Sequence, residues 1–452
     1  MKPSIELDLT VTSFSEKGYG VARLEGSKVE IAHTIPGDEV KIGLQRKRKG
    51  IKKGKLLEVL KASSDRIQPK CKHATLCGGC SWQQMSYEAQ LKCKENIVKD
   101  AFQTASVRPI IPAVDPWNYR NKMEFTFSEN AAKTKFLGLM IAHAAYVFNL
   151  EECHLAKPWV SNVVNQVRAW WEKSGLLAYK LQTNSGCLRH LTIKEGFRTS
   201  EKMVILTIAG SPLPEEFQKS FVKCIQETLD ESVTIVLRVQ KIQKGTPTQI
   251  EEITLHGKGH ILEMLFPEDP LYFRIGPSSF FQPNPLQAEI IYREGINMLE
   301  LNENSLVYDL YSGTGTLGMC ASRKAGKVLG IELCPKAVKD AEENIALNKL
   351  SNFTMHQGDA GKVLTRLLGM SNIFSPDCVI VDPPRAGLDP LAISHLQRIR
   401  AKKILYISCN PRTQALNVQE LERCGYELKL IQPIDQFPHT AHVENVVLLV
   451  LK

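Results

Sequence analysis

The chain has 452 residues, of which 43% are hydrophobic and 23% are charged, and its formal net charge is +9 at pH 7. This composition is that of a soluble protein long enough for about two to four domains, and no run approaches the roughly 20 apolar residues of a membrane span. The N-terminus contains acidic residues and no apolar core, so it is not a signal peptide, and we expect a cytoplasmic protein without membrane contact. The positive charge favours an anionic partner. In a reducing compartment, twelve cysteines indicate a metal site and catalysis rather than disulfides.

Residues 1–62 predict a small β-barrel of the OB type. Short runs in which apolar and polar residues alternate are separated by turns that contain glycine. The stretch Arg46–Lys55 carries seven basic residues in ten and no acidic residue. On such a barrel a basic loop contacts phosphates, and the alternative is a solvated loop without a partner.

Three cysteines follow on one short loop. Cys71, Cys77 and Cys80 have the spacing C-x5-C-x2-C, and the two glycines between the last two let the backbone fold tightly. The fourth ligand of a metal site would be Cys93 or Cys153. Zinc, held by four cysteines or by three cysteines and a nearby histidine, and a [4Fe–4S] cluster both fit this pattern.

Residues 63–270 predict an α+β middle domain that begins with the cysteine loop. Residues 86–105 have the apolar spacing of an amphipathic helix. From Tyr119 to about Leu265 the chain is rich in strand patterns, which predict an antiparallel sheet. Arg120–Lys122 precedes the first of these strands and is either an RNA contact or an exposed turn.

Residues 271–452 alternate strand and helix patterns, which predicts a doubly wound, Rossmann-like α/β domain. The strand S-L-V-Y-D-L runs into Gly313, Gly315 and Gly318, which have the spacing G-x-G-x-x-G at the start of a helix. Glu332 lies 19 residues after Gly313, at the end of the next strand, where a carboxylate accepts ribose hydroxyls. These features indicate a nucleoside cofactor and fit NAD, FAD and S-adenosylmethionine equally.

Two further strands of this domain end in chemically distinctive turns. Asp382 begins the turn D-P-P-R, in which two prolines hold the backbone extended and aim the carboxylate into the cleft, unless the turn is only a stiff loop. Such turns resemble those of methyltransferases that act on bases. Cys409 follows a buried strand and precedes a helix that begins at Pro411, where free backbone N–H groups should lower the pKa of the thiol and make it a nucleophile. The alternative is a structural cysteine.

Glu444 stands at the start of the last apolar strand, after His439 and His442, which are either structural or line the substrate site. Apolar neighbours should raise the pKa of its carboxyl, as a general base near neutrality requires, unless Glu444 is a surface residue. A thiolate that adds to C6 of a pyrimidine makes C5 nucleophilic, and a base must later remove the C5 proton. Cys409 and Glu444 fit these two roles in the methylation of a pyrimidine at C5.

Almost the whole chain resembles the RNA 5-methyluridine methyltransferases, which use S-adenosylmethionine. The resemblance is carried by F-Q-P-N (Phe281–Asn284), D-L-Y-S-G-T-G-T, D-P-P-R, S-C-N-P and H-V-E. It implies that Gln282 contacts the cofactor or the target base. The residues that it implies for cofactor binding are Gln282, Tyr311, Thr316, Glu332, Asp359 and Asp382. Position 316 is commonly Asn in the family, so this contact departs from the usual pattern.

The ribosomal-RNA branch of this family carries an N-terminal TRAM domain, which residues 1–62 resemble, and a [4Fe–4S] cluster held by four cysteines. The resemblance therefore favours iron–sulfur over zinc, with Cys71, Cys77, Cys80 and Cys153 as the ligands. It also implies that the helix at 86–105 packs on the catalytic domain.

From these observations we expect a monomeric enzyme that methylates a uridine of 23S ribosomal RNA at C5. One alternative is a tRNA uracil-C5 methyltransferase, or a methyltransferase that acts at another base atom. Another is an RNA-binding assembly factor for the ribosome with an inactive methyltransferase domain. The presence of both Cys409 and Glu444 argues against the inactive factor.

Overall fold

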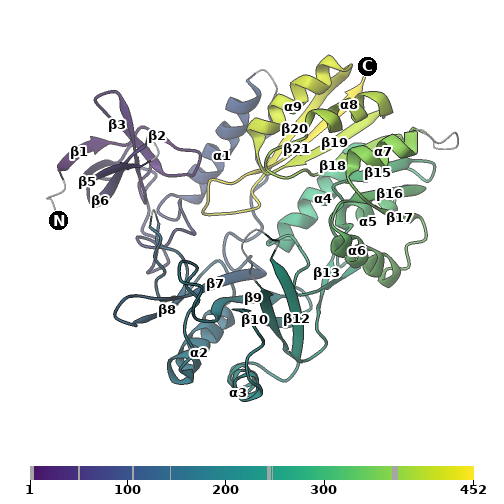
Figure 1. Ribbon diagram of the computed structural model, residues 1–452. Coiled ribbons are helices and arrows are strands. Elements are labelled where there is room, and N and C mark those ends of the chain that lie inside the picture. Colours follow the sequence, from purple (N-terminus) through teal and green to yellow (C-terminus); the bar gives the residue numbers. More distant parts are fainter. Residues whose placement is uncertain are drawn as a thin grey trace.

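The structure is a computed structural model that describes residues 5–48, 51–103, 106–142, 144–241, 246, 248–368 and 375–452. Figure 1 shows three bodies: a small β-domain drawn in purple, a central domain drawn in teal, and a catalytic domain drawn in green and yellow. Among the described residues no helix is long and apolar enough to cross a membrane.

The N-terminal β-domain is a six-stranded sheet around its own apolar core, in the strand order β1-β5-β6-β4-β3-β2. Its strands are β1 (Glu6–Thr10), β2 (Ser13–Phe14), β3 (Gly20–Leu24), β4 (Ser27–Ile31), β5 (Glu39–Arg48) and β6 (Ile51–Lys61). The predicted basic stretch Arg46–Lys55 falls on the adjoining ends of β5 and β6, and residues 49–50 within it lie outside the described residues.

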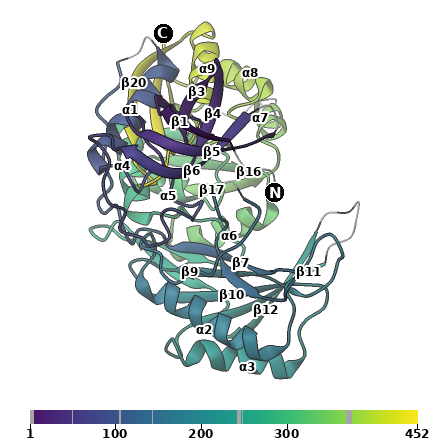
Figure 2. The same ribbon diagram turned by 90° about the vertical axis from the view of Figure 1, so that its left-hand side faces the viewer.

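The central domain is a six-stranded sheet with two helices on one face (Figure 2). Its elements are β7 (Lys122–Glu129), β8 (Lys135–Gly138), α2 (Pro158–Ser174), β9 (Leu188–Glu195), β10 (Lys202–Ala209), α3 (Glu215–Gln226), β11 (Thr234–Lys241) and β12 (Gln249–His256). The prediction of a purely antiparallel sheet is wrong at one place, because β10 and β11 pair in parallel. Helix α3 connects these two strands, and a crossover helix of this kind returns the chain in the same direction.

The catalytic domain contains a seven-stranded sheet in the order β17-β16-β15-β18-β19-β21-β20, in which β21 runs antiparallel to both of its neighbours. Its strands are β15 (Leu306–Leu310), β16 (Lys327–Glu332), β17 (Phe353–Gln357), β18 (Cys378–Val381), β19 (Lys403–Ser408), β20 (Tyr426–Ile434) and β21 (Glu444–Leu451). Helix α4 (Pro285–Leu299) precedes β15, and the helices between the strands are α5 (Thr316–Ser322), α6 (Pro335–Leu347), α7 (Ala360–Leu368), α8 (Pro390–Ile399) and α9 (Pro411–Arg423). This confirms the predicted Rossmann-like architecture.

Two elements from earlier in the chain join the catalytic domain. The hairpin of β13 (Ile261–Leu265) and β14 (Leu271–Ile275) packs with α4 and α5 on one face of the sheet, so the expected boundary at 270/271 falls inside this hairpin. Helix α1 (Tyr87–Phe102) packs on the other face, against the same core as α7, α8 and α9. The expected packing of this helix on the catalytic domain is therefore confirmed.

Candidate active site

Cys409 and Glu444 lie together at the end of the catalytic sheet where its parallel strands have their carboxyl ends. Strands β19 and β21 pair in antiparallel register, with Ser408 opposite Asn445. Cys409 directly follows the end of β19 and Glu444 is the first residue of β21, so the register brings the two side by side. Sequence alone predicted the two strands but not that they are hydrogen-bonded neighbours.

The environment of Cys409 differs from the expectation. The predicted lowering of its pKa is wrong, because burial and the neighbouring Glu444 carboxylate raise the pKa of the thiol to about 11. Asp382 acts in the same direction and the Arg385 guanidinium partly opposes it. Desolvation and carboxylate charge therefore outweigh the helix N-terminus that begins at Pro411.

Glu444 has the environment that the sequence predicts for a general base. Its side chain is buried, and burial together with Asp382 raises the pKa of the carboxyl well above its ordinary value. The interpretation as a surface residue is thus wrong. Arg385 again opposes the shift, so this guanidinium acts on both Cys409 and Glu444.

The turn D-P-P-R is fastened to the loop that carries Cys409. Asn410 Nδ2 donates to the carbonyl oxygen of Arg385 at 3.0 Å, and Thr413 Oγ1 donates to the same oxygen at 3.3 Å. The Arg385 side chain lies 3.0 Å from His442 Nδ1, which links this turn to the segment before Glu444. Asn410 and Arg385 therefore hold together three segments that are distant in the sequence.

The glycine loop after β15 is held by two carboxylates. Glu332, at the end of β16, accepts hydrogen bonds from the backbone N–H groups of Gly313 at 2.9 Å and of Cys334 at 2.8 Å. Glu332, the residue predicted to bind the ribose, therefore lies against the glycine loop, as in nucleotide-binding folds. Gly313 and Gly315 both have positive φ angles, of 56° and 78°, which side chains with a Cβ rarely adopt.

Asp309 is the second carboxylate, and the sequence analysis assigned it no role. It accepts hydrogen bonds from Ser312 Oγ at 2.6 Å and from Gly318 N at 3.0 Å. Burial raises the pKa of its carboxyl to about 7. The signal in the sequence was an acidic residue inside the apolar run L-V-Y-D-L, where an unpaired carboxylate is costly.

The remaining predicted cofactor residues of the catalytic domain follow the ends of its parallel strands. Tyr311 directly follows β15 with a φ of 61°, and Thr316 begins α5. Asp382 follows β18, and burial and Asp309 raise the pKa of its carboxyl to about 7. Asp359 lies between β17 and α7, and its carboxylate accepts from Lys362 N at 3.0 Å. The described residues contain no lysine or arginine that forms an ion pair with Asp309 or Asp382, so a cation bound here would find uncompensated carboxylates.

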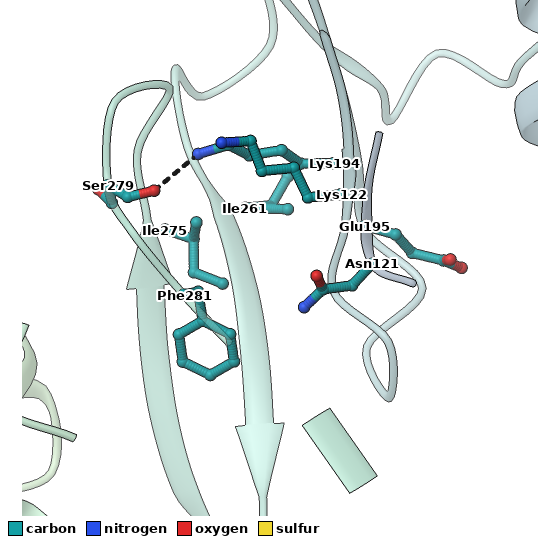
Figure 3. A pocket seen from close by; sticks show the side chains of 8 residues that line it. All are labelled: Asn121, Lys122, Lys194, Glu195, Ile261, Ile275, Ser279 and Phe281. Carbon is teal, nitrogen blue, oxygen red and sulfur yellow. Dashed lines mark hydrogen bonds between the residues drawn. The ribbon is translucent and has the colours of Figure 1, made fainter. Parts of the chain in front are cut away.

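Gln282 lies on a loop that the central domain holds in place. Asn121 Nδ2 donates to its carbonyl oxygen at 3.1 Å, so Asn121 is a structural residue rather than an exposed turn. Figure 3 shows the small pocket beside this loop, where Lys194 reaches Ser279. Lys194 Nζ donates to the carbonyl oxygens of Gly276 and Ser279, both at 2.9 Å.

The four predicted metal ligands also come together. Cys71, Cys77, Cys80 and Cys153 line one cavity of about 110 Å³, and none of them forms a disulfide. Cys93 is not among the lining residues and packs instead beside Trp82. Within the part of the chain that the structure describes, no group of three or more His, Cys, Asp or Glu is arranged to hold a metal ion.

Arg120 contributes a positively charged side chain to the lining of this cavity. It lines the cavity, and its buried Nε has no hydrogen-bond partner. Its charge favours the thiolate forms of Cys80 and Cys153, although burial keeps the pKa of both thiols raised. An anionic group held by the cysteines would satisfy this guanidinium.

The sheet order, the glycine loop and the carboxylates at the strand ends define a class I methyltransferase. Residues 86–452 match the family described as tRNA (Uracil-5-)-methyltransferase, and residues 7–64 match a second family, described as the TRAM domain of tRNA (uracil(54)-C(5))-methyltransferase. The chain belongs to this family and is an RNA uracil-5 methyltransferase.

Two relatives and one solved structure are similar over nearly the full length. An uncharacterized RNA methyltransferase of Protochlamydia amoebophila is 43% identical over 443 residues, which cover 94% of this chain and 100% of the relative. An uncharacterized RNA methyltransferase of Caldanaerobacter subterraneus is 33% identical, with coverage of 98% and 97%. The Pyrococcus abyssi tRNA (uracil-54, C5)-methyltransferase, solved in complex with S-adenosyl-L-homocysteine, is 24% identical with a TM-score of 0.76, and the match covers 98% of this chain and 100% of that one. At this identity the last match establishes a shared fold.

Proposed function

We propose that this enzyme methylates C5 of a uridine in a folded RNA, with Cys409 as the nucleophile and Glu444 as the base. The observation that carries the proposal is the pairing of β19 with β21, which sets a thiol beside a buried carboxyl at the mouth of the nucleoside-type site. An enzyme that methylates an exocyclic amine needs neither group.

The residues act in a defined order. Cys409, once its thiol proton has passed to solvent, forms a bond from its sulfur to C6 of the uracil, and the electron pair of the C5=C6 double bond moves toward C5 and the C4 carbonyl. S-Adenosylmethionine, when bound, would supply the methyl group that C5 takes up, with S-adenosylhomocysteine as the neutral leaving group. Glu444 then takes the proton from C5, the double bond re-forms, and Cys409 leaves as a thiolate. Burial of Glu444 suits this role because a carboxylate with a raised pKa is a stronger base.

The carboxylates near the glycine loop fit the proposed cofactor. Glu332 would hold the ribose hydroxyls, and the family resemblance assigns Gln282, Tyr311, Thr316 and Asp359 to the same cofactor. Asp382 forms no ion pair with a lysine or arginine among the described residues, and the positive charge of a sulfonium would compensate its carboxylate. The same charge would oppose the carboxylate effect that keeps Cys409 protonated.

Two variants test the chemistry. Cys409→Ala should abolish methyl transfer and leave the affinity for S-adenosylmethionine within about threefold, and full turnover would reject the mechanism. Glu444→Gln should accumulate a covalent RNA–protein adduct, seen as a shifted band on a denaturing gel. If no adduct forms, the base is a different residue.

We further propose that 23S ribosomal RNA is the substrate, which the four-cysteine cavity favours through the family resemblance, whereas the TRAM match does not separate the two branches because its family is described as a domain of tRNA (uracil(54)-C(5))-methyltransferase. A tRNA substrate is the second candidate. The description of the matching family names tRNA as the substrate, and the chain shares its fold with a tRNA (uracil-54, C5)-methyltransferase. Labelled S-adenosylmethionine, offered with transcripts of each RNA and followed by nucleoside mass spectrometry, separates the two. 5-Methyluridine in tRNA alone would overturn the ribosomal assignment.

We also propose that the cysteine cavity holds a [4Fe–4S] cluster. One zinc ion requires four sulfurs about 2.3 Å from a single point, whereas a cluster takes each sulfur on a separate iron and needs a wider cavity. The unpartnered Arg120 Nε suits the negative charge of a thiolate-bound cluster. Anaerobic purification should give a brown protein with broad visible absorbance, which Cys80→Ser should lose. A colourless protein that contains zinc would contradict the assignment.

A further inference from the structure

The loop that leads into Glu444 is unusually polar for its burial. This β20–β21 loop, Asp435–Val443, connects the last two strands of the catalytic sheet. Asp435 and Gln436 are 0% exposed, and His439 and Thr440 are also buried. Loops normally run over the surface, because their backbone groups need partners. Partners for this loop must therefore come from elsewhere in the chain.

Helix α1 supplies the first of these partners through an ion pair. Lys94 Nζ lies 2.5 Å from Asp435 Oδ1 and also donates to the carbonyl oxygen of Phe437 at 2.9 Å. Both side chains of the ion pair are 0% exposed. Tyr87, also on α1, donates from its hydroxyl to Asp435 Oδ2 at 2.8 Å. The first and third residues of the loop are thus fixed by one helix.

Gln90, one turn before Lys94 on the same helix, fixes the middle of the loop. Its Oε1 accepts from His439 N at 2.8 Å. Its Nε2 donates to the carbonyl oxygens of Trp82 at 3.1 Å and of Met85 at 2.9 Å. Gln90 therefore joins the loop to the segment that follows the cysteines. Its partners on both sides are backbone atoms, so these contacts do not depend on the rotamers of other side chains.

Three aromatic residues outside α1 also hold the loop. The rings of Trp117 and His439 stack with centroids 3.9 Å apart and an angle of 28° between their planes. Tyr119 donates from its hydroxyl to the carbonyl oxygen of Pro438 at 3.1 Å, and Trp82 N donates to that of His439 at 3.1 Å. The loop is consequently held by α1 and by the segments that directly precede and follow this helix in the chain.

A buried ion pair is a poor source of stability, because desolvation of both charges offsets most of their attraction. Its better-attested use is to fix one arrangement among several. The arrangement fixed here is that of a loop whose next residue is Glu444. We propose that Lys94 and Gln90 are positioning residues that set the Glu444 carboxylate for removal of the C5 proton. This inference rests on the proposed role of Glu444 as the base.

The inference predicts which reaction step fails when the contacts are lost. Cys409 lies on a different loop, so addition to C6 should proceed nearly as before. Proton removal should slow, because a base misplaced by about 1 Å costs on the order of 100-fold in rate. We expect Lys94→Met and Gln90→Ala to slow the decay of the covalent RNA adduct by about 10- to 100-fold and to change its formation by less than about threefold.

The experiment is a single-turnover time course with full-length protein, RNA and S-adenosylmethionine, in which the adduct band and the 5-methyluridine product are both quantified. Lys92→Met, which removes an exposed lysine of α1, is the matched control and should behave as wild type. The double variant Lys94→Met/Asp435→Leu removes both charges and leaves no unpaired ion, so it keeps the fold even if the single variant does not.

Each outcome has a distinct meaning. Slow adduct decay in the folded double variant supports the positioning role, and decay at the wild-type rate overturns it. An equal slowing of formation and decay also overturns it, because that is the result of a general structural defect. The variant Glu444→Gln, measured in parallel, separates the failure of the proposed base from the failure of the positioning role. If Glu444→Gln forms no adduct, the proposed base is wrong. If it forms an adduct while the adducts of the Lys94 variants decay at the wild-type rate, only the positioning role is wrong.

Discussion

Asp309 offers a quantitative test of how the glycine loop is held. Its carboxyl is 1% exposed, and burial raises the pKa from 3.8 to about 7. The unfolded chain therefore loses this proton at lower pH than the folded protein does. The stability of the catalytic domain must fall as the pH rises from 3.8 through about 7, and the loss is complete above that value. A difference of about 3 pKa units corresponds to about 4 kcal/mol.

The variant Asp309→Asn removes the ionisation and keeps an oxygen that can accept from Ser312 Oγ and Gly318 N. Hydrogen bonds to a carboxylate are about twice as strong as those to a neutral oxygen, so part of the gain is lost. We expect the variant to match wild type near about pH 4 and to be more stable by about 2–4 kcal/mol near about pH 8.

Calorimetric melting of both proteins without cofactor, at several pH values, measures this difference. About 2 kcal/mol should raise the melting temperature of a domain of this size by roughly 4–8 °C. Asp377→Asn in the same sheet is the contrasting control. Lys402 and the Leu306 N–H hold the pKa of Asp377 below its ordinary value, so this variant should lose stability at neutral pH and recover it in acid. A difference for Asp309→Asn that is constant with pH, or largest in acid, would refute the reasoning.

Three further predictions concern the site and the RNA. Gly318→Ala should destabilise the catalytic domain by about 1–3 kcal/mol and weaken cofactor binding, because the added Cβ would lie 2.4 Å from the Phe353 ring. An unchanged melting temperature and an unchanged cofactor affinity would mean that the loop moves freely. The rate of adduct formation should rise with pH through neutrality, because the raised pKa of Cys409 leaves little thiolate there; a flat profile would mean that cofactor or RNA binding ionises the thiol first. Replacement of the basic residues of 46–55 by glutamine should weaken RNA binding and flatten its salt dependence without changing cofactor affinity, and equal RNA affinity would show that this stretch is only solvated surface.

The strands and turns that form the candidate site were predictable from the sequence. Buried strands of Val, Ile and Leu, each followed by a chemically distinctive turn, indicate which residues stand at the carboxyl ends of an α/β sheet. Glu332, Asp382 and Cys409 were placed in this way. Glu444 was placed by the last apolar run, and the raised pKa of its carboxyl followed from those neighbours.

The direction of the pKa shift of Cys409 was not predictable, because it depends on burial and on carboxylates at the ends of two other strands. A helix N-terminus is a local feature that the sequence reveals, whereas Glu444 and Asp382 act on Cys409 only through the sheet order. Asp309 was missed for a related reason, since its partners Ser312 and Gly318 become a cage only when the loop folds back. The parallel pairing of β10 with β11 is likewise a matter of register that periodicity does not encode.

The contacts between α1 and the β20–β21 loop affect the order in which the protein can fold during its synthesis. Lys94 and Asp435 are 341 positions apart in the chain. At a synthesis rate of about 5–20 residues per second, α1 leaves the ribosome roughly 20–70 s before its partner has been made. The N-terminal and central domains can fold in that interval, but the loop before Glu444 cannot be set until its own residues have been made. On the proposed mechanism, the step that releases the methylated product is therefore the last that the chain acquires.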